Sequence, residues 1–194
     1  MQTILSFLLN PLRALTPGPN GANHRRATQN VNAVWDLAKR TVGLPMAMRF
    51  FAPYVGAGVQ VSKPGPGASP IEVHMPLTFL NTNYVGTHFG GSLYSMCDPF
   101  YMFILMESLG EDYIVWDKSA TIDFLKPGTG TVSARFEIAP EIIAEIKQLV
   151  AERRKIDYVF ETDILNEAGE AVAHLQKTLY VRRAPGKKAS SRSV

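Results

Sequence analysis

The sequence predicts an α+β fold in which an antiparallel sheet of about six strands wraps around one long buried helix. Residues 89–109 carry large apolar side chains at almost every helical angle, which is typical of a helix buried on all sides. Segments in which apolar and polar residues alternate lie before and after this helix. Strands and helices do not alternate as βα units along the 194 residues, which argues against a doubly wound parallel sheet.

Residues 1–50 are expected to form a helical extension with a linker. The apolar run Ile4–Leu9 is broken by Asn10-Pro11 and is too short for a secretory signal or a membrane span. The absence of acids from residues 1–35 also fits a transit peptide, but an amphipathic helix lying on the body or on a partner is the simpler interpretation. A linker follows at Pro17–Asn23, and a second helix is predicted up to Gly43-Leu44-Pro45 from the apolar residues Val31, Val34, Trp35, Ala38 and Val42.

Residues 51–183 are expected to form the main domain, which begins with a β-hairpin after a short helical or irregular piece at Met46–Ala52. The Pro- and Gly-rich turn Lys63–Pro70 separates its two strands, whose alternating apolar residues are Val55, Val59 and Val61 in the first and Ile71, Val73 and Met75 in the second. The central helix ends at Gly110. The elements predicted after it are the strands Tyr113–Phe124 and Thr131–Ile138, the helix Pro140–Lys155, and the strands Ile156–Leu165 and Ala171–Arg183. Residues 184–194 are expected to be a flexible basic tail.

The distribution of charge excludes a nucleic-acid-binding face that covers the domain. The net charge is +3 and the pI is about 9.0. Residues 1–49 hold six Lys and Arg against one acid, and residues 182–194 hold five against none. Residues 50–181 therefore hold nine bases and sixteen acids, so the body is acidic and only the ends are basic.

The cysteine and histidine content indicates no metal site. The single cysteine, Cys97, cannot form an internal disulfide, which fits a reducing, cytoplasmic location. No base is placed to activate its thiol, so it is expected to be a small buried apolar residue. His74 and His174 lie on predicted strands and are expected to be structural. The sequence predicts neither a metal nor a cofactor.

Asp98 is the residue that most needs explanation, because it lies in the middle of the apolar helix with no cation within a helical turn. A buried unpaired carboxylate is costly, and perturbed carboxylates in apolar settings are frequent at functional sites. Pro99 cannot donate to the carbonyl of Ser95 and should kink the helix beside Asp98. Two structural alternatives remain: hydroxyls such as that of Ser95 satisfy Asp98, or the interrupted helix lets its side chain reach water.

Two glycines at the start of the same helix, Gly90 and Gly91, would let a ligand approach unpaired backbone N–H groups at the positive end of the helix dipole. Such amides can stabilise an oxyanion. The glycines equally suit close packing of the helix against the sheet. Asp98 follows about two turns later, roughly 10–12 Å along the axis, a gap that could hold an extended acyl ester.

The segment Asn83-Tyr-Val-Gly-Thr87-His88-Phe89-Gly90-Gly91, followed seven residues later by Asp98, resembles the signature of the hotdog-fold acyl-CoA thioesterases of the phenylacetyl-CoA thioesterase type. The resemblance covers about residues 50–183 and implies a hotdog fold that assembles as a homodimer or a dimer of dimers. It implies that Asp98 is the catalytic carboxylate, that Gly90 and Gly91 lie at the oxyanion hole, and that Asn83 positions the thioester or the water.

The same resemblance assigns further residues to the substrate. Asp117 or Lys118 falls where the family places a polar residue from the other subunit. Thr87 and Phe89 belong to the motif, and Met102 is expected to line an acyl tunnel because methionine adapts to flexible apolar ligands. The sequence departs from the family at Phe89, which replaces the histidine before Gly-Gly. His88 lies one position earlier: either it takes over by a local shift, or the site works with Asn83 and Asp98 alone.

The function expected from these residues is hydrolysis of acyl-CoA or another acyl thioester, with Asp98 as general base on water or, less favourably, as nucleophile. Neither a nucleic acid nor a membrane is an expected partner. A hydroxyacyl thioester dehydratase is one alternative, since His88-Phe89-Gly-Gly resembles the dehydratase motif and Glu107 could supply its carboxylate. A non-catalytic acyl-binding protein is another. Because CoA carries phosphates, the basic residues from Arg182 to Arg192 are a candidate place for them.

Overall fold

The computed structural model describes residues 37–38, 41–65 and 67–185. The predicted N-terminal helix, the linker after it and the tail beyond residue 185 lie outside these ranges. Residues 41–48 are helical, although Gly43-Leu44-Pro45 predicts an end to the helix. Gly43 does have the positive φ, 79°, expected at a helix terminus, so the signal acts locally without ending the helical run. In the described part of the chain, no helix has the length and apolar character needed to cross a membrane.

The predicted first strand is shorter than expected because its first part is helical. Helix α3 spans Ala52–Ala57. Pro53 lies in its first turn, where a missing N–H is tolerated, and Gly58 follows the helix with φ 70° and donates its N–H to the carbonyl of Tyr54. These two signals outweigh the alternation of apolar residues, and the prediction of Val55 as a strand residue is wrong. Its side chain is 59% exposed.

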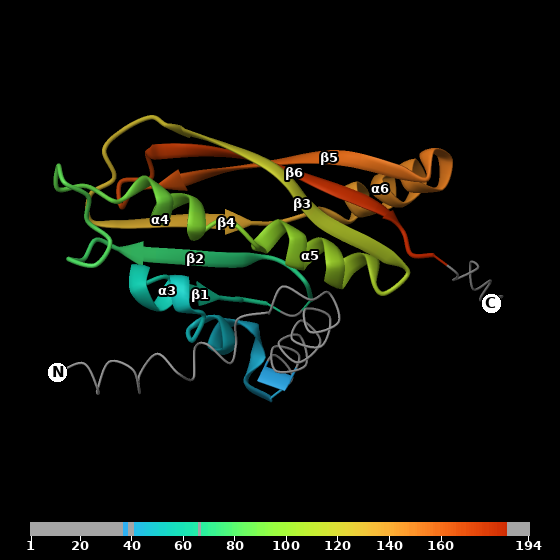
Figure 1. Ribbon diagram of the computed structural model, residues 1–194, viewed down its shortest axis with the longest axis horizontal. Helices are drawn as coiled ribbons and strands as arrows, with labels where there is room; N and C mark the ends of the chain where they lie inside the picture. Colours follow the sequence, from blue (N-terminus) through green and yellow to red (C-terminus); the bar gives the residue numbers. More distant parts are fainter. Residues whose placement is uncertain (1–36, 39–40, 66, 186–194) are drawn as a thin grey trace, which may run out of the picture. The chain divides into compact units, whose positions relative to one another are not determined.

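The described residues form a six-stranded antiparallel sheet in the order β1-β2-β4-β5-β6-β3. Its strands are β1 (Gln60–Ser62), β2 (Ile71–Pro76), β3 (Tyr113–Phe124), β4 (Thr131–Phe136), β5 (Lys155–Leu165) and β6 (Ala171–Arg183). Helix α6 (Pro140–Arg153) connects β4 to β5 at one end of the sheet (Figure 1). The predicted fold class is confirmed. The bounds of β3 and β6 are those predicted, and those of β4, β5 and α6 differ by one or two residues.

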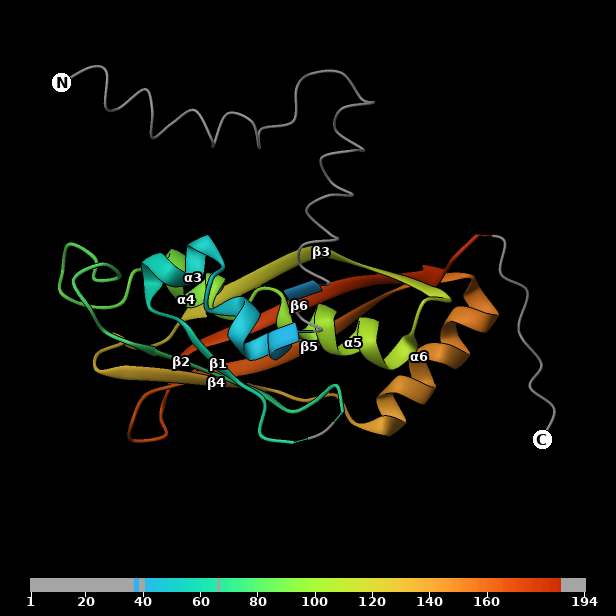
Figure 2. The same ribbon diagram turned by 90° about the horizontal axis from the view of Figure 1, so that it is seen from below.

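The central helix is divided into two parts, α4 (Gly90–Ser95) and α5 (Phe100–Leu109), which run along one face of the sheet (Figures 1 and 2). Residues 96–99 between them form turns. Pro99 has no N–H to donate to the helix, and α5 begins directly after it. The predicted kink beside Asp98 is therefore present as a complete interruption of the helix. Phe100, Ile104 and Leu105 of α5 are buried against the sheet.

The sheet is interrupted between β4 and β5, which pair in register only at Ser133 and Leu165 within the described residues. Two side chains satisfy backbone carbonyls along this seam. The hydroxyl of Tyr101, from α5, donates to the carbonyl of Glu161 in β5 at 2.5 Å. The hydroxyl of Thr162 donates to the carbonyl of Arg135 in β4 at 3.0 Å. The central helix is thus bonded to the β5 side of the seam, and the Thr162 hydroxyl links β5 to β4.

Strand β3 is an edge of the sheet and is largely exposed over twelve residues. Its other side pairs with β6 through a long register that contains a β-bulge between Asp117 and Ser119. Large apolar side chains stand in solvent along it, with Trp116 69% exposed and Phe124 58% exposed. A long exposed edge strand presents unpaired backbone groups and is a place where a second chain can add.

Candidate active site

Asp98 lies at the break between α4 and α5 and is held by two side chains. Its Oδ1 accepts a hydrogen bond from Nζ of Lys177 and another from the hydroxyl of Tyr94, both at 2.5 Å. Tyr94 precedes Asp98 by one helical turn, and Lys177 lies on strand β6. Among the residues that the structure describes, Oδ2 has no hydrogen-bond partner. The Asp98 side chain is 44% exposed, so one oxygen is fixed and the other is open to water.

Lys177 brings a second carboxylate to the same place. Its Nζ lies 3.3 Å from Oδ1 of Asp117 on β3 and 3.1 Å from the hydroxyl of Tyr94, and its side chain is only 2% exposed. Burial lowers the pKa of Lys177, but its hydrogen bonds to Asp98 and Tyr94 and the charge of Asp117 outweigh this, and the pKa is raised. Burial raises the pKa of Asp117, and the charge of Asp98 adds to this, while Lys177 acts against it.

Asp98 is therefore neither fully buried nor unpaired: the alternative in which the interrupted helix lets its side chain reach water agrees with the structure, whereas its partners are Lys177 and Tyr94 rather than Ser95. The cation comes from β6, far away in the sequence, and the broken helix gives the carboxylate access to solvent. A signal for Lys177 was present in the sequence. It occupies a position of β6 whose neighbours on the same face, Leu175 and Leu179, are buried, and a charged residue on the buried face of a strand requires a partner.

Asn83 organises the loop before α4 through four hydrogen bonds of its side chain. Its Oδ1 accepts from the backbone N–H groups of Val85 and Thr87, both at 3.0 Å. Its Nδ2 donates to Oγ1 of Thr87 at 2.8 Å and to the carbonyl of His88 at 3.2 Å. Both amide hydrogens are thus used within the loop. Asn83 therefore holds the backbone of the loop that leads to Gly90 in place.

His88 is 3% exposed and faces the turn between β3 and β4. Its Nε2 lies 3.0 Å from the carbonyl of Gly130, which requires that Nε2 carries the proton and donates it. Its Nδ1 is buried without a hydrogen-bond partner in the described part of the chain. Burial lowers the pKa of His88, and the bond to Gly130 only partly offsets this, so the ring is neutral near pH 7.

The two glycines at the start of α4 lie close to the exposed rings of Phe124 and Phe89, which would have to shift to admit a Cβ. A Cβ on Gly90 would lie 2.7 Å from the ring of Phe124, and a Cβ on Gly91 would lie 2.4 Å from the ring of Phe89. The packing alternative is therefore supported. Among the described residues, neither glycine donates its backbone N–H to another group, so both amides also remain available to a ligand.

The loop, the start of α4 and the end of β3 surround a shallow pocket of about 410 Å³. Asn83, Thr87, His88 and Gly90 line it on one side, and the segment Phe124–Gly128 lines it on the other. Asp98 and Asp117 are not part of this lining. One chain therefore brings the predicted residues together in two groups, one around this pocket and one around Lys177.

The remaining predicted residues are spread over the surface and the core. Lys118 protrudes at the bulge of β3 and pairs with Asp157 at 2.5 Å, apart from Asp117. Met102 is half-buried on α5, and Phe89 is 56% exposed at the start of α4. Glu107, the carboxylate of the dehydratase alternative, is exposed and lies 3.5 Å from Nζ of Lys63.

The other titratable groups singled out in the sequence have structural surroundings. Cys97 is buried and burial raises the pKa of its thiol, which fits an apolar packing residue. His174 pairs with Asp163 on the exposed face of the sheet at 2.7 Å. No group of three or more potential metal-binding side chains occurs within the part of the chain that the structure describes.

Comparisons with known proteins give a family and several solved structures of similar fold. A family model described as a domain of unknown function, DUF4442, matches residues 41–181. A search of curated proteins finds no match. Among solved structures, the chain is similar to a Pseudomonas aeruginosa protein of unknown function described as "Probable Thioesterase", with 20% identity, a TM-score of 0.61 and coverage of 76% of this chain and 93% of that one.

Two further solved structures share the fold. A thioesterase from Haemophilus influenzae has 19% identity and a TM-score of 0.51, with coverage of 70% of this chain and 86% of that one. A Chlorobaculum tepidum protein of unknown function has 14% identity and a TM-score of 0.59, with coverage of 79% and 96%. At these identities the likeness establishes the arrangement of helices and strands.

Proposed function

The chain belongs to the DUF4442 family and has the hotdog fold of the thioesterase-like proteins, and from this premise we propose that it hydrolyses acyl thioesters such as acyl-CoA. The observation that carries the proposal is the state of Asp98. Lys177 and Tyr94 fix one oxygen of its carboxylate, and its side chain is 44% exposed, so water can reach it. A general base needs this combination of fixed orientation and free access to a proton.

The proposed reaction uses water as nucleophile. Oδ2 of Asp98 takes a proton from a water molecule, whose oxygen attacks the thioester carbonyl. The negative charge that develops on the carbonyl oxygen is stabilised by the free N–H groups of Gly90 and Gly91. When the tetrahedral intermediate collapses, the carbon–sulfur bond breaks, the sulfur leaves with the electron pair and takes the proton held by Asp98, and a carboxylic acid and the free carboxylate of Asp98 remain. No metal or cofactor takes part.

Other residues hold this arrangement in place. We assign Asn83 and His88 to the geometry of the loop that leads to the two glycines, because their hydrogen bonds lie within that loop and with Gly130. Lys177 orients Asp98. The pocket of about 410 Å³ beside Gly90 accepts the thioester, with Thr87 in its lining. Phe89, which is 56% exposed between the lining residues His88 and Gly90, is proposed to contact the thioester. Met102 is proposed to contact the acyl chain.

A complete site is proposed to need two copies of the chain. The pocket includes Phe124 at one end of β3, whereas Asp117 lies nearer the other end. If β3 pairs antiparallel with β3 of a second copy about a twofold axis, the Phe124 end of one strand lies toward the Asp117 region of the other. The exposed edge of β3 supports such a homodimer, alone or within a dimer of dimers. With a single buried cysteine, a reducing cytoplasmic location is proposed for this assembly.

The decisive experiment compares the parent protein with Asp98→Asn on a panel of acyl-CoAs, with a reagent that detects the released thiol. The substitution keeps the size of the side chain and removes the base, so kcat should fall at least about 100-fold with a modest change in KM. Asp163→Asn, an exposed carboxylate of β5 that pairs with His174, is the matched control and should leave kcat unchanged.

Two outcomes would overturn the proposal. One is an Asp98→Asn variant as active as the parent. The other is a parent protein that binds acyl-CoA without turnover, which would make the chain an acyl-binding protein.

A further inference from the structure

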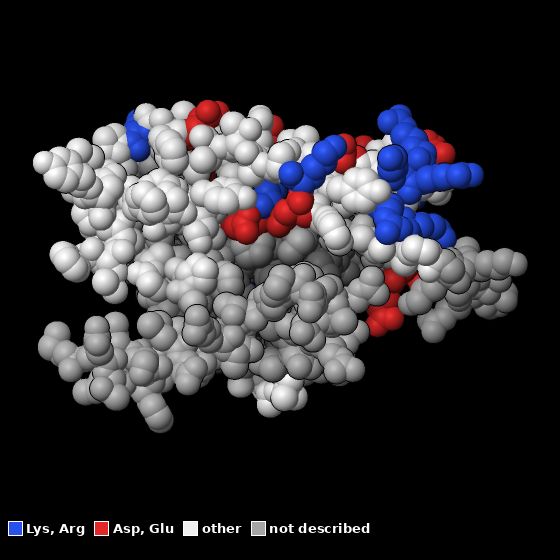
Figure 3. All heavy atoms as spheres, viewed as in Figure 1, with Lys and Arg blue, Asp and Glu red and all other residues white. Residues whose placement is uncertain are grey.

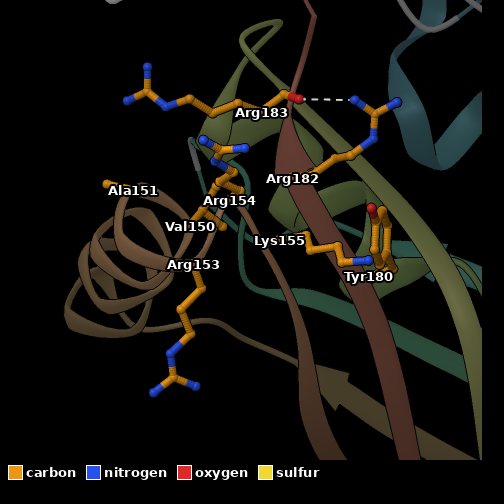
Figure 4. Close-up of a pocket in the computed structure, with 8 residues that line it drawn as sticks. All are labelled: Val150, Ala151, Arg153, Arg154, Lys155, Tyr180, Arg182 and Arg183. Carbon is orange, nitrogen blue, oxygen red and sulfur yellow. Dashed lines mark hydrogen bonds between the residues drawn. The ribbon is translucent and has the colours of Figure 1, made fainter.

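A second pocket, of about 590 Å³, lies where α6 ends and β5 begins, beside the end of β6. Figure 4 shows the residues that line it. Five of them are cationic, and they come from two separate parts of the sequence: Arg153, Arg154 and Lys155, and Arg182 and Arg183. Figure 3 shows Lys and Arg side chains gathered at one end of the described surface, whereas Lys, Arg, Asp and Glu lie intermixed over the middle of it. We call this the cationic pocket.

The cations of the cationic pocket form no ion pair with any residue that the structure describes. Within the described residues, none of the five has a carboxylate within 4.0 Å, whereas cations of the neighbouring strands and turns do: Lys118, Lys126, Arg135 and Lys177. Asp157, the acid of β5 that is nearest to Lys155 in the sequence, is paired with Lys118. Some positive charge is favourable at the C-terminus of α6 through the helix dipole, but the dipole accounts only for the last turn and does not extend to Lys155 or β6.

The strand register adds to the repulsion. Lys155 of β5 and Arg182 of β6 lie directly opposite each other. Like charges at directly opposed positions destabilise a sheet. The backbone at the end of α6 is a second unfavourable feature. Arg154 has φ 67° and is the one residue other than glycine with a positive φ in the part of the chain described by the structure. Glycine is the usual residue for such a backbone. An unfavourable arrangement of this kind is typical of a site whose ligand supplies the compensation.

The residues and the volume of the cationic pocket indicate the chemical class of its ligand. Tyr180 and Lys155 both line it, and Arg182 donates to the carbonyl of Arg183 at 3.1 Å (Figure 4). Arginine and lysine bind phosphate oxygens, and an aromatic ring offers a surface on which a base can stack. The volume of the pocket is within the range of small-molecule sites. We propose that the cationic pocket binds the phosphate groups of a nucleotide, with the base against Tyr180.

The cationic pocket is distinct from the Asp98 group. Side chains alternate along β6, and Lys177, Leu179 and Val181 are buried on the face toward the central helix, whereas Tyr180 and Arg182 lie on the other face. Two sources offer the required chemistry: the phosphorylated nucleotide end of CoA, and a free nucleotide. The site does not depend on the proposed hydrolysis, because none of its residues takes part in that reaction.

The test measures binding to the full chain by titration calorimetry, with coenzyme A, dephospho-CoA, ADP and pyrophosphate as probes. ADP or coenzyme A should bind, and more tightly than pyrophosphate, which has no base. The double variant Lys155→Met/Arg182→Met should weaken binding at least about tenfold, as expected for the loss of charge-assisted hydrogen bonds. It should fold like the parent, because it removes a repulsive pair. Lys147→Met, an exposed cation of α6 outside the pocket, should bind like the parent.

Two supporting outcomes identify the source. Tighter binding of coenzyme A than of dephospho-CoA, with a higher KM for acyl-CoA in the double variant, assigns the site to the carrier of the substrate. Equal binding of ADP and coenzyme A, with an unchanged KM, assigns it to a free nucleotide. Asp98→Asn should bind the same probes as the parent, so a failure of hydrolysis and a failure of nucleotide binding are observed separately.

Three results would overturn the proposal. They are the absence of binding for all four probes, unchanged binding in Lys155→Met/Arg182→Met, and an RNA oligomer that displaces every probe and binds more tightly than any of them.

Discussion

Lys177 is the residue on which the proposed chemistry depends most after Asp98, because its ammonium group lies between two carboxylates and a tyrosine hydroxyl. A buried cation with partners of this kind is costly to remove, since the charges left behind have no compensation. Lys177 acts on Asp98 by orienting its carboxylate and by supplying a positive charge. It is therefore a positioning residue and not only a packing residue.

Lys177→Met is expected to lower kcat/KM and to move the acidic limb of its pH profile upward, because Asp98 loses a donor that orients it and the positive charge that counteracts the rise in the pKa of Asp117 is removed. The free energy of unfolding should fall by about 1–3 kcal/mol, less than for a fully buried pair because both carboxylates are partly exposed. Measurement of kcat/KM from acid to neutral pH and urea unfolding of both proteins test this. A lower rate with an unshifted profile would reduce Lys177 to a structural role.

His88 is expected to make the protein less stable in acid. Burial depresses its pKa in the folded state, so between the unfolded pKa of about 6.5 and the lower folded pKa the unfolded chain binds the additional proton. Its contribution is thus present above pH 6.5 and is lost as the pH falls through the folded pKa. His174 has the opposite sign, because its hydrogen bond to Asp163 raises its pKa and its contribution is lost as the pH rises.

Urea unfolding at pH 7.5 and pH 5.0 measures this difference. His88→Gln should reduce the loss of stability between the two pH values, whereas His174→Gln, the control, should leave it as large as in the parent or increase it. An acid-induced loss that is the same in His88→Gln and the parent would contradict the assignment.

At the scale of elements, the sequence predicted the strands better than the ends of helices. Strands β3 and β6 have the bounds expected from alternation, and Pro99 marked the break between α4 and α5. The alternation of valines that includes Val55 was misleading, because Pro53 and Gly58 determine the local backbone. Asp98 could be identified from its apolar surroundings on a single helix. Its partner could not, because contact with Lys177 depends on tertiary packing between elements.

The seam between β4 and β5 yields a prediction at this scale. Tyr101→Phe removes the hydroxyl that donates to the carbonyl of Glu161 and leaves that carbonyl without this partner. The free energy of unfolding should fall by about 1–2 kcal/mol, the usual cost of one partly buried hydrogen bond. Urea unfolding tests this, with Tyr158→Phe as the control, because the hydroxyl of Tyr158 contacts only exposed Glu145 at 3.4 Å. An equal loss in both variants would contradict it.

For the whole molecule, the exposed edge of β3 connects assembly with activity. The ring of Phe124, at the end of this edge strand, packs against Gly90, whose N–H is proposed to bind the oxyanion. A second copy that pairs with β3 would therefore fix the start of α4 from outside. The proposed site is complete only in such an assembly.

Specific activity is therefore expected to fall on dilution, in parallel with the fraction of dimer. Sedimentation and enzyme assays over the same range of protein concentration test this together. Trp116→Lys places a charge at the exposed edge and should move both curves to higher concentration. Activity that stays constant while the protein dissociates would show that a single chain is sufficient.

Because Arg154 has a positive φ, backbone stability and ligand binding favour different residues at this position. A glycine would relax the backbone there but would remove one of the five cations of the cationic pocket. Selection for stability alone would favour the glycine, and selection for binding would preserve the arginine. Within the family, the residue after α6 should therefore vary together with the cations of β5 and β6, so the presence of arginine there would mark the members that have kept a nucleotide site.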